Sequence, residues 1–270
     1  MAGVSLSLAG KTALITGGSR GIGAETVRLF RAAGARVAFS YRAAADRARA
    51  IEQETGEQGD KPLCVGIEQE LETAADGRAL VEKAVASLGR LDILVVNHGI
   101  WPPEDAPIAT MTDAQWRRTM GVNLDAAFGA VQAAVARMLE QSSTAGPQSG
   151  AAKGHIVLIS STAGQRGEAF HSDYAASKGA LISLTKSLSS ELAPTGIRVN
   201  CVAPGWVDTE MAAGTLGDPV LGPRVRAQIP LGRPASPREI AGPVLFLCTP
   251  LAGFISGEVL NVNGGAVLVG

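Results

Sequence analysis

Cysteine is scarce in this sequence of 270 residues, and a long hydrophobic run is absent. Cys64, Cys201 and Cys248 form no CxxC pair, which argues against a disulfide framework and a zinc site, so we expect small buried thiols. No apolar stretch approaches the roughly 20 residues of a membrane span. The N-terminal residues MAGVSLSLAG lack the basic and apolar regions of a signal peptide. These absences predict a cytoplasmic protein without a bound metal or a membrane partner.

An excess of charge of either sign is also missing. The chain has 24 basic and 25 acidic residues, which leaves a formal net charge of −1. The arginines lie among acidic residues and form no basic arm, so we expect no nucleic-acid partner. Hydrophobic residues make up 46% of the chain, which is enough to bury a large core.

Short apolar runs recur along the whole chain and alternate with stretches of helical periodicity, such as AETVRLFRAAG and ADGRALVEKAVASLG. Such alternation predicts βαβ units, and hence a parallel sheet with helices on both faces. We predict an α/β fold, a doubly wound Rossmann-type sheet of seven parallel strands in one domain over residues 1–270. The strands are expected at 12–16, 36–40, 62–66, 91–97, 155–160, 197–204 and 258–264.

Two segments depart from this alternation. Residues 141–154 (QSSTAGPQSGAAKG) are rich in small and polar residues, and we interpret them as a flexible surface loop after a long helix at about 112–140. Residues 209–235 contain many Gly and Pro residues and follow a predicted strand, where an α/β sheet opens its ligand crevice. We expect this second segment to be a mobile cover for a substrate.

A glycine-rich turn, TGGSRGIG at 16–23, joins the first strand to the first helix. Gly17, Gly21 and Gly23 would allow a sharp turn, a close approach of a pyrophosphate and tight helix packing. The helix N-terminus would offer free N–H groups to the anion. The turn therefore predicts a dinucleotide site.

The end of the second strand indicates which dinucleotide binds. An acidic residue there usually bonds a free ribose 2′-hydroxyl, but this strand ends in Ser40, Tyr41 and Arg42, with no acid before Asp46. Arg42, helped by Arg20, could hold a 2′-phosphate, so we predict NADP(H). The alternative is that both arginines are solvated surface charges and the cofactor is NAD(H).

Tyr174 and Lys178 lie four residues apart in the stretch YAASK, on one face of a predicted helix. A carbonyl oxygen must gain a proton when a hydride reaches its carbon, and a phenol of ordinary pKa is too weak an acid–base at neutral pH. A neighbouring ammonium would lower the pKa of the phenol. The pair therefore predicts a proton-transfer site.

Further motifs share their order and spacing with a known family. They are VNHG at 96–99, GVNL at 121–124, ISS at 159–161, APGWVDTEM at 203–211 and FISGEVLNVNGG at 254–265. With the glycine turn and YAASK, they make the chain resemble the single-domain short-chain dehydrogenases/reductases, and it is similar to the 3-oxoacyl-[acyl-carrier-protein] reductases among them. The resemblance implies a ketone or secondary-alcohol oxidoreductase.

The resemblance also implies roles for individual residues. Tyr174 would be the general acid or base, Lys178 would lower its pKa and bond the nicotinamide ribose, and Ser161 would orient the substrate oxygen. Asn123 would hold a water of a proton relay. The remaining cofactor contacts implied are Gly17, Ser19, Arg20, Gly21, Ile22, Gly23, Tyr41, Arg42, Glu70, Leu71, Asn97, His98, Gly99, Pro204, Gly205, Val207 and Thr209.

Two of these positions depart from the family pattern. His98 replaces a small alanine, and it is either a pocket-lining histidine bonded to the backbone or else a substrate contact or an extra titrating group near the nicotinamide. Glu70 stands where the family commonly has an aspartate that bonds the adenine edge. Trp101, Trp206 and His171 would line the substrate mouth or pack in the core, and we expect Trp116 in the core.

Other functions remain open from the sequence. One is an NAD(H)-dependent alcohol or sugar dehydrogenase of the same family, and another is a dinucleotide-sensing protein without catalysis. An epimerase or dehydratase of the longer family type would need TGxxGxxG and a larger C-terminal region. By resemblance, the helices at about 112–140 and 173–193 and the C-terminal strand would form the interfaces of a homotetramer.

Overall fold

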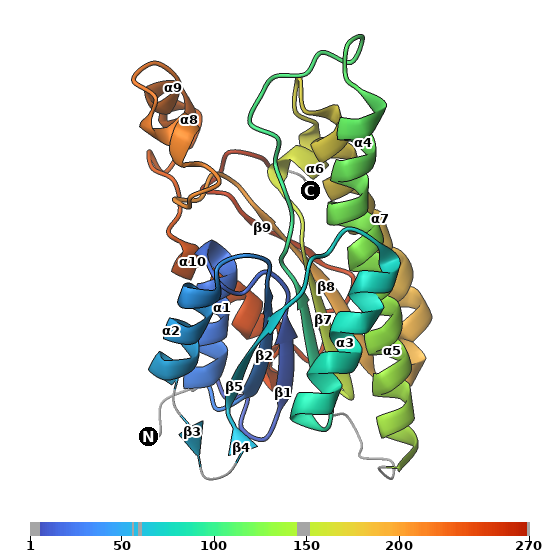
Figure 1. Cartoon of the computed structure of the whole chain (residues 1–270). Helices are drawn as coiled ribbons and strands as arrows, with labels where there is room; N and C mark the ends of the chain where they lie inside the picture. The colour runs from blue at the N-terminus through green and yellow to red at the C-terminus, as the bar shows by residue number, and fades with distance from the viewer. Residues whose placement is uncertain (1–5, 56, 59–60, 145–151, 269–270) are drawn as a thin grey trace.

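The computed structural model of the chain describes residues 6–55, 57–58, 61–144 and 152–268 (Figure 1). Its centre is a parallel sheet of seven strands in the order β5-β2-β1-β6-β7-β8-β9, which confirms the predicted fold class. A separate antiparallel pair, β3 (Glu57–Gln58) and β4 (Lys61–Pro62), was not expected from the sequence. The strands of the main sheet are β1 (Thr12–Ile15), β2 (Arg36–Tyr41), β5 (Cys64–Glu68), β6 (Ile93–Val96), β7 (Gly154–Ile159), β8 (Ile197–Pro204) and β9 (Val259–Val262).

The short apolar runs become central strands because both of their faces are covered. Every residue of β1, β6 and β7 is buried. In β1, Ala13 and Ile15 belong to the apolar cluster on one face, and Leu14 belongs to the cluster on the other. A strand buried on both sides loses the alternation of polar and apolar residues, and this explains its continuous hydrophobic sequence.

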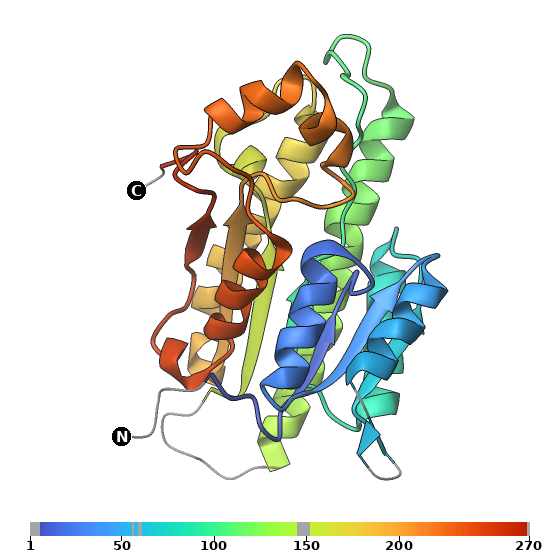
Figure 2. The same ribbon diagram turned by 90° about the vertical axis from the view of Figure 1, so that its left-hand side faces the viewer.

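Helices cover both faces of the sheet, as the two views in Figures 1 and 2 show. On the first face lie α1 (Gly21–Ala32), α2 (Ala45–Thr55) and α10 (Pro237–Leu247). On the second face lie α3 (Ala74–Leu88), α5 (Ala126–Thr144) and α7 (Ser172–Leu192). Among the described residues, no helix is long and apolar enough to cross a membrane.

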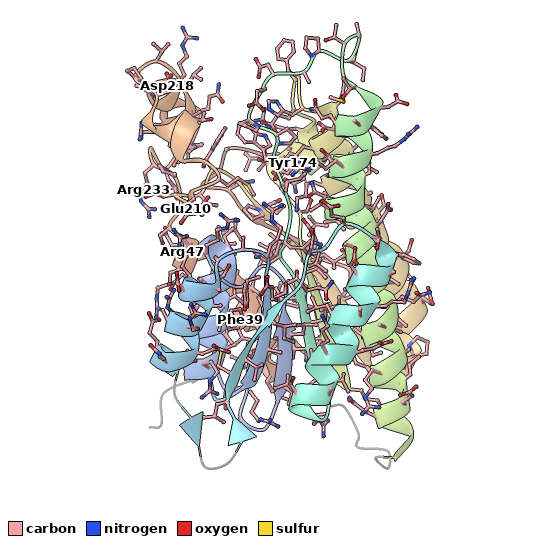
Figure 3. The ribbon with its side chains drawn as sticks, in the orientation of Figure 1. Phe39, Arg47, Tyr174, Glu210, Asp218 and Arg233 are labelled. Atoms are coloured by element: carbon pink, nitrogen blue, oxygen red, sulfur yellow. The ribbon has the colours of Figure 1, made fainter. Side chains whose placement is uncertain are left out.

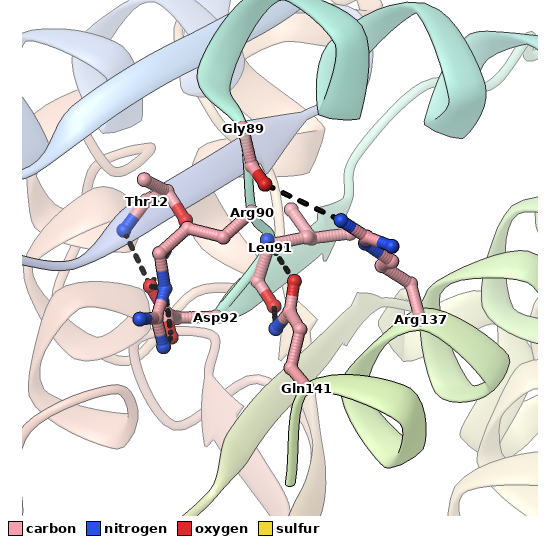
Figure 4. A network of polar contacts seen from close by, with 7 residues as sticks. All are labelled: Thr12, Gly89, Arg90, Leu91, Asp92, Arg137 and Gln141. Atoms are coloured by element: carbon pink, nitrogen blue, oxygen red, sulfur yellow. Dashed lines mark hydrogen bonds and ion pairs between the residues drawn. The ribbon is translucent and has the colours of Figure 1, made fainter. Parts of the chain in front are cut away.

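A polar network lies at the end of the sheet where β1 and β6 begin (Figure 4). Asp92 accepts hydrogen bonds from the backbone N–H and the hydroxyl of Thr12, both at 2.9 Å, and pairs with Arg90 at 2.6 Å. The Gln141 amide bonds the backbone N–H and C=O of Leu91, each at 2.8 Å. These contacts join the start of β6 to β1 and α5, at the end of the sheet opposite to the carboxyl ends of the strands.

The predicted loop at 141–154 begins too early, because α5 continues to Thr144. The bonds between Gln141 and Leu91 hold this last turn against the sheet. Residues 145–151 of the predicted loop lie outside the described residues, and β7 begins at Gly154.

The segment at 209–235 forms two short helices, α8 (Ala213–Gly217) and α9 (Leu221–Ala227). They project beyond the carboxyl ends of the strands (Figures 1 and 2). The segment has its own small apolar cluster, separate from the two cores of the sheet, made of Ala212, Leu216, Val225 and Ile229. An extension with an independent core can shift without disturbing the sheet, so its role as a mobile cover stays a prediction.

Candidate active site

A cavity of about 490 Å³ opens at the carboxyl ends of the strands. The strand order reverses between β1 and β6, and ligands of doubly wound sheets bind at such a reversal. The cavity volume lies within the range of small-molecule sites. Of the predicted site residues, all except Gly23 and Asn123 line this cavity.

The glycine turn shapes one end of the cavity. Gly17 has φ +66°, a left-handed conformation that favours glycine. Gly23 lies below the turn, where a Cβ atom would come within 2.1 Å of the Gly17 carbonyl oxygen, so its role in the structure is packing. The side-chain amide of Asn97 donates to the carbonyl oxygens of Thr16 and Gly17, both at 3.1 Å. This bond fixes the turn from β6.

The predicted 2′-phosphate arginines both lie at this end and both face carboxylates. Arg42 is 3.8 Å from Glu70, and Arg20 is 3.4 Å from Glu210. Glu210 also pairs with Arg47 of α2 (Figure 3). All five side chains are about half exposed, so these ion pairs are weak and an incoming phosphate could replace the carboxylates.

Tyr174 and Ser161 meet at the middle of the cavity. Ser161 ends the stretch after β7 and caps α6 (Thr162–Arg166), because its Oγ accepts from the Ala163 N–H at 3.1 Å. The Ser161 hydroxyl also lies close enough to the Tyr174 phenol to lower the pKa of the phenol. Two hydroxyl groups from different elements therefore point at one place, where a substrate oxygen can be held.

Burial is the largest influence on the pKa of Tyr174. Burial raises the pKa of Tyr174 to about 12, although the Ser161 hydroxyl opposes this rise. Lys178 Nζ donates to the Ile159 carbonyl at 2.9 Å and lies 5.9 Å from the centre of the phenol ring, and the lowering of the Tyr174 pKa by this ammonium remains a prediction. Burial also lowers the pKa of Lys178, to about 8. The sequence placed the pair on one helix face but did not reveal that Lys178 is buried and Tyr174 half-buried.

Asn123 lies behind the cavity in a π-helical turn, Gly121–Asp125, between α4 (Asp113–Met120) and α5. The residue is fully buried, and its amide clamps both backbone groups of Ile100, at 2.8 and 3.0 Å. A Cβ atom on Gly99 would come within 3.1 Å of Asn123 Oδ1 and 3.2 Å of Lys178 Nζ. Asn123 and Lys178 therefore converge beneath Gly99, and the predicted water relay remains a prediction.

His98 is a neutral histidine whose ring is hydrogen-bonded to the Thr16 hydroxyl. The Thr16 hydroxyl oxygen accepts the N–H groups of Asn97 and His98, at 2.9 and 3.1 Å, so its own proton goes to His98 Nδ1, 2.7 Å away. The ring proton must then be on Nε2. Burial, with a smaller effect of Lys178, lowers the pKa of His98 to about 4. This geometry supports the first interpretation, a pocket-lining histidine that does not titrate near neutral pH.

The predicted aromatic residues separate into three places. Trp101 and Trp206 line the cavity, with their ring centres 6.3 Å apart and an angle of 80° between the rings. His171 is buried behind Trp101 and stacks on it at 4.8 Å. The core prediction for Trp116 is wrong: it is 39% exposed, whereas Thr119 of the same helix is buried against α7, where its hydroxyl donates to Asp173.

Sequence reasoning missed Glu168, which lines the cavity and is half-buried. Burial raises the pKa of this carboxyl, while His171 and the indole N–H of Trp101 oppose the rise. Its position in the 12 residues between Ser161 and Tyr174 was the available signal. That spacing does not say which of the intervening side chains turns inward.

Comparisons with known proteins show which family the chain resembles over nearly its whole length. The family model described as enoyl-(acyl carrier protein) reductase matches residues 17–267. An acetoacetyl-CoA reductase of Rhizobium meliloti is 39% identical over 255 residues, which are 94% of this chain and 98% of the relative. The 3-oxoacyl-[acyl-carrier-protein] reductase FabG of Aquifex aeolicus is 36% identical and covers 97% of this chain and 99% of its own length. A crystal structure of a short-chain dehydrogenase from Burkholderia cenocepacia in complex with NADP superposes with a TM-score of 0.83 at 34% identity, covering 96% of this chain and 98% of that one.

Proposed function

Because the chain belongs to the short-chain dehydrogenase/reductase family, we propose that it interconverts a ketone and a secondary alcohol with NADP(H), through the hydroxyl groups of Tyr174 and Ser161. The observation that supports this proposal most strongly is the meeting of these two hydroxyls inside a cavity that the glycine turn closes at one end. The two curated relatives described above are named as reductases of 3-oxoacyl compounds.

The residues of the cavity fit a dinucleotide. Because Gly17 has no Cβ atom, the space beside His98 stays free. The helix α1 begins four residues later, at Gly21. A phosphate there would meet unpaired backbone N–H groups and the positive end of the helix dipole. The cofactor, when bound, supplies or accepts the hydride.

Tyr174 would donate the proton that the substrate oxygen gains in reduction. With a pKa near 12 the phenol keeps its proton at neutral pH, so it can donate to the substrate oxygen, which becomes an alkoxide in reduction. An alkoxide is a stronger base than a phenolate, so this transfer is downhill. Ser161 would hold the oxygen during the transfer, and Lys178, fixed on the Ile159 carbonyl, would place its positive charge beneath the site.

The 2′-phosphate preference rests on Arg42 and Arg20. Both line the cavity, β2 ends without an acid, and the Burkholderia cenocepacia structure is a complex with NADP. Binding would replace the contacts of these arginines with Glu70 and Glu210 by charge-assisted bonds to phosphate. A preference for NADH in kcat/KM would overturn this part of the proposal.

Three further proposals concern the whole chain. We expect it to act as one domain with residues 209–235 as a substrate cover, and to act in the cytoplasm, which cell fractionation tests. We expect a homotetramer, since Phe128 and Leu139 of α5 and Phe254 near the C-terminus are large apolar side chains exposed in the single chain. A monomer mass in light scattering would contradict the tetramer.

The proposed function is tested by a panel of ketones and secondary alcohols, each assayed with NADPH or NADP and with NADH or NAD by nicotinamide absorbance. Reduction of at least one ketone class, faster with NADPH, is the expected result. Tight binding of a dinucleotide without turnover of any carbonyl or alcohol would contradict it and would favour the non-catalytic sensor.

A further inference from the structure

The mouth of the cavity contains a carboxylate that the proposed reaction does not use. Glu168 lines the cavity with Tyr174, and it is a charge that raises the pKa of the Tyr174 phenol. The carboxylate is therefore near the place where the substrate reacts. A negative charge at that place hinders the ionisation of Tyr174, so it needs another reason to be there.

The backbone around Glu168 holds it in a fixed turn. Gly167 has φ +79° and Phe170 has φ 65°, a conformation that a bulky side chain rarely adopts. The Phe170 carbonyl accepts the N–H of Ala106 at 3.0 Å, and the Glu168 carbonyl accepts the N–H of His171 at 3.2 Å. Strained residues of this kind persist where the surrounding structure holds them, and they are frequent at functional sites.

Two indole rings face the same part of the cavity. Trp101 and Trp206 stand at 80° to each other, and His171 covers one face of Trp101 with the rings nearly parallel, at 7°. The indole N–H of Trp101 lies close enough to the Glu168 carboxylate to stabilise its charged form. We call Glu168, Trp101 and Trp206 the aromatic corner.

A carboxylate beside indole rings is suited to a cation. The face of an indole attracts a positive charge, most strongly when it is removed from water, and the carboxylate adds a direct Coulomb attraction. An anionic substrate would meet the charge of Glu168 next to Tyr174. Arg166 also lines this end of the cavity and lowers the pKa of Glu168, but its side chain is exposed, so solvent screens its charge and an incoming ammonium group can compete with it for the carboxylate.

We infer that the substrate carries an ammonium group, which binds in the aromatic corner while its carbonyl or hydroxyl oxygen lies at Tyr174 and Ser161. This inference rests on the proposed oxidoreductase function and names its substrate class. An aminoketone, or the amino alcohol made from it, would place the positive charge a few bonds from the reacting carbon.

The test uses two ketones of the same shape. Acetonyltrimethylammonium and methyl neopentyl ketone differ only by nitrogen in place of carbon, so their kcat/KM ratio measures the effect of the charge. We expect the wild-type chain to prefer the cation by about 10-fold or more. Glu168→Gln should lower this ratio by about 10-fold or more, whatever its effect on the neutral ketone through the pKa of Tyr174, and Glu104→Gln, which removes an exposed acid outside the cavity lining, should leave the ratio as it is.

A second readout needs neither cofactor nor turnover. Tetramethylammonium is titrated into the free protein, and the fluorescence of its tryptophans is followed. Saturable quenching that Glu168→Gln weakens and Glu104→Gln preserves is the expected result. An equal or lower kcat/KM for the cationic ketone, a ratio that Glu168→Gln does not change, or a preference for acetoacetate would overturn the inference. If no ketone is reduced, the proposed function fails, and the titration alone decides whether the corner binds cations.

Discussion

Replacing His98 by alanine should make the free energy of unfolding fall less steeply when the pH is lowered. His98 is neutral in the structure, with a pKa lowered to about 4, whereas an unfolded histidine has a pKa near 6.5. Between these values the unfolded chain binds more protons than the folded one, so stability rises with pH and is lost as the pH falls from about 6.5 towards 4. The contribution of His98 is therefore complete above about pH 7 and is lost on acidification.

The size of the effect follows from the same two values. If the pKa of His98 is lowered fully from 6.5 to about 4, the free energy of unfolding at about pH 5 is about 2 kcal/mol lower than at neutral pH. Since His98 is partly accessible from the cavity while its Nε2 is enclosed, we expect roughly 1–2 kcal/mol. His155, whose pKa burial also lowers to about 4, supplies a second contribution that the His98 variant keeps.

The assay is urea unfolding of the wild type and His98→Ala between about pH 5 and 8, at one protein concentration. At neutral pH the variant carries a constant penalty, because Thr16 loses its partner at 2.7 Å. The two curves of stability against pH should converge by roughly 1–2 kcal/mol on acidification. Curves that stay parallel, or that diverge in acid, would show that the imidazole is not held neutral by burial.

Four other substitutions test separate parts of the structure. Arg42→Ala should raise KM for NADPH roughly 3- to 10-fold and leave KM for NADH nearly unchanged, and an equal change for both cofactors would contradict a phosphate contact. Gly23→Ala should cost about 3 kcal/mol in urea unfolding because its Cβ would meet the Gly17 carbonyl, whereas Gly242→Ala, with nothing within 4 Å, should stabilise α10 by up to about 1 kcal/mol. Asp92→Ala should lower the free energy of unfolding by about 2–3 kcal/mol, because Arg90 and Thr12 lose their acceptor. The activity per folded molecule should stay unchanged, because the cavity lies at the opposite end of the sheet.

The sequence was sufficient for features that depend on neighbours along the chain. Both faces of β1 and β6 are covered, so their continuous apolar runs predicted central strands correctly. The glycine turn was recognisable because a strand and a helix flank it directly. Tyr174 and Lys178 lie on one face of α7 because helical spacing alone brings them together.

Features that depend on distant contacts could not be predicted. The π-helical turn at Gly121–Asp125 accompanies the clamp of Asn123 on Ile100, which is 23 residues earlier in the chain. Glu168 lies in a turn held by the bond from Ala106 to Phe170, and no periodicity marks that contact. The exposed position of Trp116 depends on which face of α4 meets α7, and the pKa of Tyr174 depends on burial by several elements at once.

The central claim is that the Tyr174 hydroxyl gives its proton to the substrate oxygen. Its most direct test compares the wild type with Tyr174→Phe, which removes the hydroxyl and keeps the ring. We predict that kcat falls by roughly 10²- to 10⁴-fold while the Kd for NADPH, measured by its fluorescence, stays within about 3-fold. A variant that retains most of the wild-type kcat would contradict the account.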